Sequence, residues 1–147
     1  MSDLFAEIVG FNQDISSWDV SNVTRMYEMF RSALSFNQPI GNWDVSDVTD
    51  TQFMFLNAGA FNQPIGNWNT SSVTIMVEMV WHTVSFNQDL SGWNVDNVTN
   101  CSNFDWITPP NGHSQNLTSL IVFRDERRLF GQVLYWSFCN MCFSNSV

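Results

Sequence analysis

Hydrophobic and polar positions recur along this chain at a constant spacing of 25 residues. Each unit opens with Phe-Asn-Gln, reaches an isoleucine or leucine four residues after the phenylalanine, and reaches a tryptophan three residues later. A Val-Thr pair and a Met-x-x-Met-Phe motif follow, with some drift between copies. The phenylalanines and tryptophans of the four units are Phe11, Trp18, Phe36, Trp43, Phe61, Trp68, Phe86 and Trp93. Because no insertion interrupts the spacing, the pattern predicts stacked copies of one unit, with these aromatic residues as the repeat core.

The trio Ile15, Trp18 and Val20 has the L-x-x-L-x-L spacing of a leucine-rich repeat, in which alternate residues of a short strand point inward. The position between the tryptophan and the valine then faces solvent. This predicts an outward row formed by Asp19, Asp44, Asn69 and Asn94. The predicted fold class is a leucine-rich-repeat-like solenoid, with short parallel β-strands on one face and turns and short helical or 3-10 segments on the other.

The same register divides the whole chain. Leu4 and Phe5 lie 25 residues before Met29 and Phe30, so we expect the first residues to be the tail of an incomplete preceding repeat. The spacing of Leu117, Leu120 and Val122 half restores the pattern, which predicts a degenerate strand. The expected segments are the tail 1–10, the repeats 11–35, 36–60, 61–85 and 86–106, and an irregular C-terminal cap 107–147 with its strand at 117–123.

The consensus I-x-x-W-x-V-S-x-V-T-x-M-x-x-M-F-x-x-A-x-x-F-N-Q resembles the BspA-like leucine-rich repeats and the related Mycoplasma-type surface-protein repeats. The resemblance covers roughly residues 1–106 and implies a solenoid with a parallel sheet. It also implies a cell-surface or extracellular protein, or a component of a virion or another assembly, that binds proteins and has no catalytic residues. No signal peptide is recognisable in Met1–Gly10.

Composition limits the classes of partner. The chain has 14 acidic residues against five arginines and no lysine, for a net charge of -9, which repels phosphate backbones. We therefore expect no nucleic-acid partner. The 44% of hydrophobic residues is enough for a core, yet no apolar run is long enough to predict a transmembrane segment. Three cysteines leave the redox compartment open.

Several features have a structural and a functional interpretation. Exposed tryptophans would stack on carbohydrate, but their inward position favours core packing. The Asn-Gln pairs would either contact a ligand or form amide ladders between units, and ladders are favoured. The aspartates match no calcium-loop spacing, which favours a solvated face. The sequons at Asn22, Asn69, Asn97, Asn100 and Asn116 are explained in part by the repeat itself.

A metal site would have to start from the single CxxC motif at Cys139 and Cys142. A structural zinc ion needs four ligands, and Cys101, His82 and His113 are the remaining cysteine and histidines that could complete the set. No phosphate-binding loop, G-x-S-x-G or H-E-x-x-H motif occurs. We therefore predict no cofactor and no enzyme activity, with a zinc-dependent enzyme as the alternative from another class.

The sequence predicts a non-catalytic protein-protein interaction or adhesion module. The row Asp19, Asp44, Asn69 and Asn94 is its candidate interaction surface. The main alternative is an architectural subunit packed in a larger cellular or viral assembly. Because Leu4, Phe5 and Ile8 match interior positions of later units, we also expect self-association through an open N-terminal end.

Overall fold

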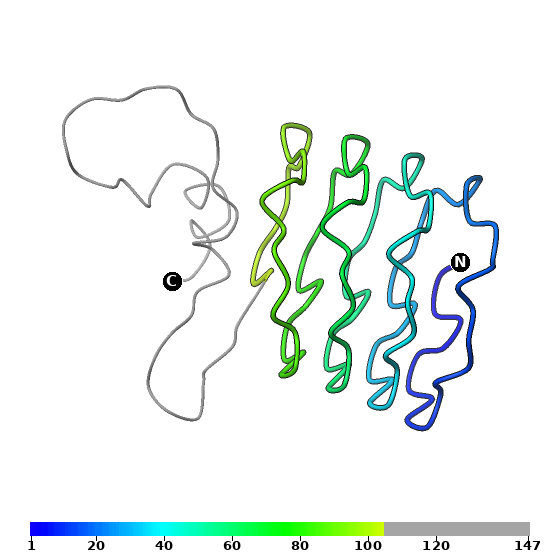
Figure 1. Ribbon diagram of the computed structural model, residues 1–147. Coiled ribbons are helices and arrows are strands. Elements are labelled where there is room, and N and C mark those ends of the chain that lie inside the picture. Colours follow the sequence, from blue (N-terminus) through cyan, green and yellow to red (C-terminus); the bar gives the residue numbers. More distant parts are fainter. Residues whose placement is uncertain (105–147) are drawn as a thin grey trace.

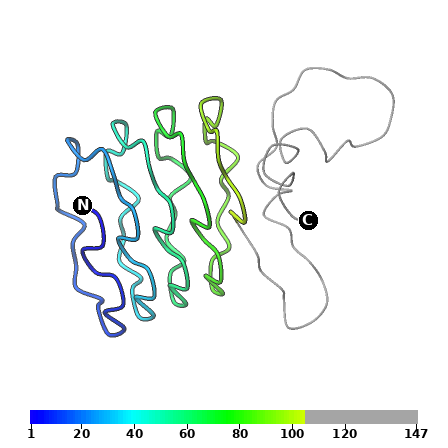
Figure 2. The same ribbon diagram turned by 180° about the vertical axis from the view of Figure 1, so that it is seen from behind.

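A computed structural model describes residues 1–104 of the chain. These residues wind into successive coils that lie side by side in chain order, with the N-terminus at one end of the stack (Figure 1). The view from behind shows the same order (Figure 2). We call residues 1–10 the leading segment and residues 11–35, 36–60, 61–85 and 86–104 the first to fourth coils. The cap predicted for 107–147, with its strand at 117–123, lies outside the described residues.

Each coil has two parts that recur at the same positions. The first part, which we call the Asn-Trp stretch, is residues 11–24 of the first coil and the equivalent residues of the others. The second part, the Met-Phe turns, is residues 26–33 and its equivalents. The distinction matters because the two parts bond to their neighbouring coils in opposite directions.

The described residues contain no helix and no strand. The β-type backbone pairing consists of isolated parallel bridges, one between each pair of successive coils. They join Arg25 to Asp50, Asp50 to Ile75, and Ile75 to Asn100. The predicted fold class is therefore wrong: the coils carry neither a parallel sheet on one face nor helical or 3-10 segments on the other.

The expected strand fails because its amides are used within the coil. The Trp18 N–H donates to the Ile15 carbonyl at 3.1 Å, and the Val23 N–H donates to the Val20 carbonyl at 2.8 Å. Each bond closes a four-residue turn. A parallel ladder needs evenly spaced amides that bond to the neighbouring strand, and two consecutive turns do not supply them. The same turns recur in the second coil, where the equivalent trio Ile40, Trp43 and Val45 is buried, so the inward spacing is produced by turns.

The expected helical segment fails because of backbone handedness. Met29 and Ala33 close turns onto the carbonyls of Met26 and Phe30, at 3.3 and 3.1 Å. Glu28 and Ser32, the third residues of these turns, have φ angles of 52° and 55°. A left-handed residue interrupts a right-handed helix. The same two positions are left-handed throughout the described chain, at Asp3, Glu7, Phe53, Asn57, Glu78, His82 and Asn103.

Backbone hydrogen bonds between coils keep the 25-residue register. In the Met-Phe turns the earlier coil donates to the later one, as in Glu28 N–H to the Gln52 carbonyl at 3.0 Å. In the Asn-Trp stretch the later coil donates to the earlier one, as in Thr49 N–H to the Thr24 carbonyl at 2.9 Å. Both directions repeat between the second and third coils. Toward the following coil, each coil therefore presents donors on its Met-Phe turns and acceptors on its Asn-Trp stretch.

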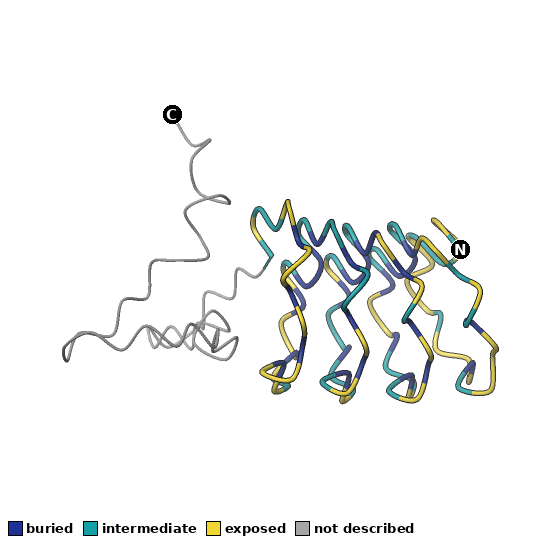
Figure 3. Ribbon diagram, turned by 90° about the horizontal axis from the view of Figure 1, so that it is seen from above, coloured by how far each residue is buried: buried dark blue, intermediate teal, exposed yellow. Residues whose placement is uncertain are grey.

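Stacked aromatic rings fill the interior of the coils. The rings of Phe30 and Phe36 lie 3.9 Å apart, and Phe55 and Phe61 repeat this stack at 3.9 Å in the next unit. Rings of successive coils also contact, because Phe30 and Phe55 lie 5.5 Å apart. All four side chains are fully buried. Figure 3 shows buried and exposed positions following one another around each coil. Burying such large apolar surfaces is the main favourable term for the stack.

Candidate interaction surface

The outward row predicted from the sequence is exposed on the Asn-Trp stretches. Its members are Asp19, Asp44, Asn69 and Asn94, one from each coil. Each side-chain Oδ1 accepts a hydrogen bond from the backbone N–H two residues further on. The donors are Ser21 at 3.0 Å, Ser46 at 3.0 Å, Ser71 at 3.2 Å and Asp96 at 2.9 Å. These Asx turns fix the side chains of the row while leaving their second polar atoms toward solvent.

The two carboxylates of the row stay charged. Hydrogen bonds from the Ser21 side chain and backbone hold the pKa of Asp19 below its ordinary value of 3.8. The Ser46 side chain and backbone do the same for the pKa of Asp44, against a smaller opposing effect of desolvation and of the Asp19 charge. Hydrogen bonding to the charged form is the general cause of such a shift. The row is therefore anionic at neutral pH and remains so in mild acid.

The Asn-Gln pairs form a ladder between coils. Asn12 Oδ1 accepts the Asn37 N–H at 2.9 Å and the Gln38 amide at 2.9 Å. The same bonds recur at Asn37 and at Asn62 with the next coils. A side-chain oxygen that receives two donors from the neighbouring coil is occupied in holding the stack.

Six of the eight predicted core aromatics are buried, and these are Phe36, Phe61, Phe86, Trp43, Trp68 and Trp93. The indole N–H of each buried tryptophan donates to the backbone carbonyl of an isoleucine in the preceding coil, as Trp43 does to Ile15 at 3.3 Å. The first coil differs. Phe11 is only partly buried and Trp18 remains 39% exposed. The described chain places no earlier Asn-Trp stretch against them.

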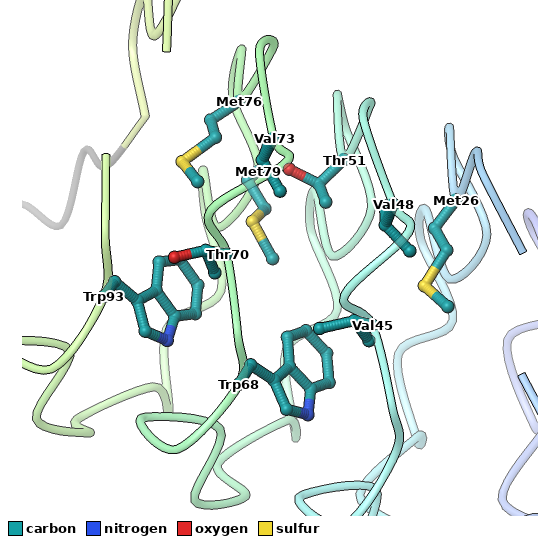
Figure 4. Close-up of a pocket in the computed structure, with 10 residues that line it drawn as sticks. All are labelled: Met26, Val45, Val48, Thr51, Trp68, Thr70, Val73, Met76, Met79 and Trp93. Carbon is teal, nitrogen blue, oxygen red and sulfur yellow. The ribbon is translucent and has the colours of Figure 1, made fainter. Parts of the chain in front are cut away.

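One hollow among the described coils lies in their apolar interior, and another opens on their surface. An apolar cavity of about 10 Å³ has roughly the volume that one water molecule needs. Figure 4 shows Trp68, Trp93 and Met79 among its lining residues. An open hollow of about 370 Å³ lies between the turns of the third and fourth coils, next to Pro64 and Asp89. Among the described residues, the row Asp19, Asp44, Asn69 and Asn94 is exposed on the outside of the coils.

The cysteine and histidine set considered for zinc is only partly described. Within residues 1–104 no group of three His, Cys, Asp or Glu side chains is placed to hold a metal ion. Cys139, Cys142 and His113 lie outside the described residues. His82 occupies one of the left-handed turn positions, with a φ of 55°.

A second exposed row was not predicted. Val9, Leu34 and Val84 occupy equivalent positions and are 54%, 40% and 69% exposed. Gly59 holds the same position in the second coil, and a Cβ there would lie 3.9 Å from the Val84 side chain. We call this the Val-Leu row. Its signal was present in the sequence as a 25-residue recurrence of uncharged residues at a position between the two motifs.

Two ion-pair groups join neighbouring coils on the Met-Phe side. The Arg25 guanidinium bonds to the nearly buried Asp50 carboxylate at 3.0 Å. Arg31 pairs with Glu28 at 2.7 Å and with Glu7 of the leading segment. The arginines at 25 and 31 are thus engaged with carboxylates, and the charged residues of the described Asn-Trp stretches are all aspartates.

Comparison with known families identifies the repeat. The family described as Mycoplasma protein of unknown function, DUF285, matches residues 1–116. The chain belongs to this family. The DUF285 match spans the leading segment and all four coils, so the Mycoplasma-type part of the resemblance is confirmed. No curated protein and no solved structure matches the chain. In the part of the chain that the structure describes, no helix is long and apolar enough to span a membrane.

Proposed function

We propose that this DUF285 chain is a non-catalytic module that binds a protein partner through the row Asp19, Asp44, Asn69 and Asn94. The observation that supports the proposal is the fixed orientation of the row, in which each Oδ1 is held by the backbone N–H two residues on. Side chains that are ordered before binding lose little conformational entropy when a partner arrives. A row repeated across four coils also offers an extended contact surface.

The charge of the row indicates the chemistry of the partner. Asp19 and Asp44 present carboxylates, while Asn69 and Asn94 present amides that both donate and accept hydrogen bonds. Together with the net charge of -9, this arrangement favours a partner whose surface carries arginine or lysine at one end and neutral polar groups at the other. We therefore propose a basic protein surface as the target.

Peptide display tests this proposal. Random peptides selected on the immobilised full chain should be enriched in arginine and lysine, and their affinity should fall as salt concentration rises. Replacing Asp19 and Asp44 together with asparagine keeps the Asx turns, because Asn69 and Asn94 already make them, yet removes the charge. This double substitution should weaken the affinity of the chain for the selected peptides by about tenfold or more.

A charge-matched pair provides the control. Asp47 and Asp96 are also exposed, and their carboxylates accept no hydrogen bond from the described residues. Replacing these two with asparagine should leave binding of the same peptides nearly unchanged. Peptides without basic residues, or equal losses in the two pairs of variants, would contradict the proposed row.

An architectural role in a larger cellular or viral assembly is the second candidate. The observation that favours it is the Val-Leu row, because an assembly subunit is covered on more than one side and exposed apolar side chains gain from such cover. We further propose a closer kinship with BspA-like repeats, supported by the joint recurrence of Trp-x-Val, Val-Thr and Met-x-x-Met-Phe. The location that we propose from this kinship is the cell surface or a virion.

A further inference from the structure

The N-terminal face of the stack leaves large apolar side chains exposed. Leu4 and Ile8 of the leading segment are 45% and 49% exposed, and Trp18 of the first coil is 39% exposed. Their equivalents in the next coil, Met29, Ala33 and Trp43, are 0%, 0% and 4% exposed. The difference arises because the later positions are covered by the coil that precedes them. An apolar face of this kind favours contact with another surface.

One half of this face consists of hydrogen-bond donors. At each coil boundary the Asn-Trp stretch donates to the coil before it, through an asparagine N–H, a glutamine amide, an indole N–H and a threonine N–H. The corresponding donors in the first coil belong to Asn12, Gln13, Trp18 and Thr24. None of these four groups donates to another described residue.

The other half of the face consists of acceptors. The carbonyls of Tyr27, Met29 and Arg31 accept the N–H groups of Asp3, Phe5 and Glu7 at 2.9, 3.0 and 2.7 Å. The corresponding carbonyls of the leading segment belong to Ser2, Leu4 and Ala6. They accept no hydrogen bond from the described residues. The face therefore offers donors on one half and acceptors on the other.

We infer that this face binds a second copy of the chain in a two-fold dimer. A two-fold interface uses the same patch on both partners, so the patch must be complementary to itself. The two-fold axis lies in the plane of the face, on the line between the donor half and the acceptor half. Rotation about this axis places the donor half of each copy against the acceptor half of the other. The same rotation brings the exposed Leu4, Ile8 and Trp18 of both copies into one apolar contact.

This geometry excludes the simpler head-to-tail alternative. A second copy that approached with its fourth coil would bring residues 101–104 to the place that the leading segment already occupies, because 1–4 and 101–104 hold equivalent positions in the 25-residue register. Head-to-tail stacking would also not close, so it would produce aggregates of increasing length. The face-to-face arrangement closes after two copies.

Sedimentation equilibrium of the full chain across a wide range of concentrations tests the dimer. We expect a monomer-dimer equilibrium without larger species. Leu4→Glu should weaken the dimer by about tenfold or more by placing a charge in the contact, and Gln13→Glu should do so by replacing a donor with an acceptor. Both side chains are exposed, so the melting temperature of the monomer should stay close to that of the unchanged chain.

Val84→Glu is the matched control, since Val84 is 69% exposed on the third coil and away from this face. It should leave the dimer intact. A monomer at every concentration, growth into larger species, or a dimer unaffected by both Leu4→Glu and Gln13→Glu would overturn the inference. Loss of the dimer in Val84→Glu alone would assign self-association to the Val-Leu row. These outcomes are independent of peptide binding to the Asp19 and Asp44 row.

Discussion

At the scale of single residues, the coils use two different sets of turn residues after the Asn-Gln pair. The first and fourth coils have Asp-x-Ser, in which Asp14 and Asp89 accept the N–H groups of Ser16 and Ser91 at 2.9 and 2.8 Å. The second and third coils have Pro-Ile-Gly instead. Proline restricts the backbone in the way that the aspartate hydrogen bond does, so either set holds the turn.

The glycine of the second set has a separate role. A Cβ at Gly41 would lie 2.3 Å from the Pro64 carbonyl oxygen, and one at Gly66 would lie 2.2 Å from the Asp89 carbonyl oxygen. Such distances are far inside van der Waals contact, and the obstructing atoms belong to backbone. These glycines therefore permit the close approach of successive coils at the turn.

We predict that Gly66→Ala destabilises the chain by about 1–3 kcal/mol, because the neighbouring turn must move away from the new methyl group. Chemical denaturation monitored by tryptophan fluorescence measures the change. Gly10→Ala is the control, since a Cβ at Gly10 meets nothing within 4 Å. It should change the free energy of unfolding by no more than about 0.5 kcal/mol. Equal effects at the two glycines would show that close approach is not the reason for glycine at 66.

At the scale of the coil, the environment of a tryptophan depends on whether another Asn-Trp stretch lies before it. The Trp43 side chain is 4% exposed and its indole N–H donates to the Ile15 carbonyl, whereas Trp18 is 39% exposed and its indole N–H donates to no described residue. Trp43→Ala should therefore cost about 3–5 kcal/mol of folding free energy, and Trp18→Ala about half of that or less. Thermal and urea denaturation of the two variants compare the same substitution at equivalent positions. A larger loss for Trp18 would contradict the described burial.

The coil also shows why the sequence predicted some features and missed others. The recurrence of Phe-Asn-Gln and tryptophan fixes the 25-residue register, and the backbone hydrogen bonds between the described coils join residues 24 to 26 positions apart. The spacing of Ile40, Trp43 and Val45 could not separate a strand from two turns, because both structures bring these residues inward. Left-handed positions carried no glycine to mark them: Glu28 and Phe53 occupy two of these positions. The remaining signal was the presence of residue types that tolerate this conformation better, at Asp3, Asn57, His82 and Asn103.

The candidate surface was predictable for a different reason. Asp19 and its equivalents lie between two inward residues, so either a strand or a turn places them outside. Their Asx turns could not be predicted, since these depend on the backbone of Ser21 and its equivalents. The N-terminal face was predictable in its apolar residues but not in its division into donor and acceptor halves, which follows from bond directions that only the three-dimensional arrangement shows.

At the scale of the whole molecule, acid should remove a stabilising contribution of the exposed Asx turns. The folded-state pKa values of Asp14, Asp19, Asp44 and Asp89 are lowered by hydrogen bonds from the serine two residues on. A lowered pKa means that this contribution is complete above the ordinary value of 3.8 and is lost as the pH falls through the folded-state values. The melting temperature should therefore decline below that pH for this reason.

Two double variants, each with two aspartates replaced by asparagine, separate the contribution of the Asx turns to stability from the effect of net charge. With Asp19 and Asp44 replaced, the decline in acid should be shallower than in the unchanged chain. With Asp47 and Asp96 replaced, the net charge changes equally, but these carboxylates accept no hydrogen bond from the described residues. Differential scanning calorimetry from neutral pH to acid measures both. The same acid decline in the two double variants would contradict a role for the Asx turns.

The opposite bond directions of the Asn-Trp stretches and the Met-Phe turns have an electrostatic consequence. In an α-helix all peptide dipoles point the same way and add to partial charges at the two ends. Here Thr49 N–H points back toward the first coil while Glu28 N–H points forward to the second, so the dipoles along the stack oppose each other. The cancellation is partial, because four backbone N–H groups of the first coil donate forward to carbonyls of the second, and the N–H groups of Thr49 and Ala60 donate back. A coil added to such a stack therefore contributes less net dipole along the axis than the same number of residues in a helix would.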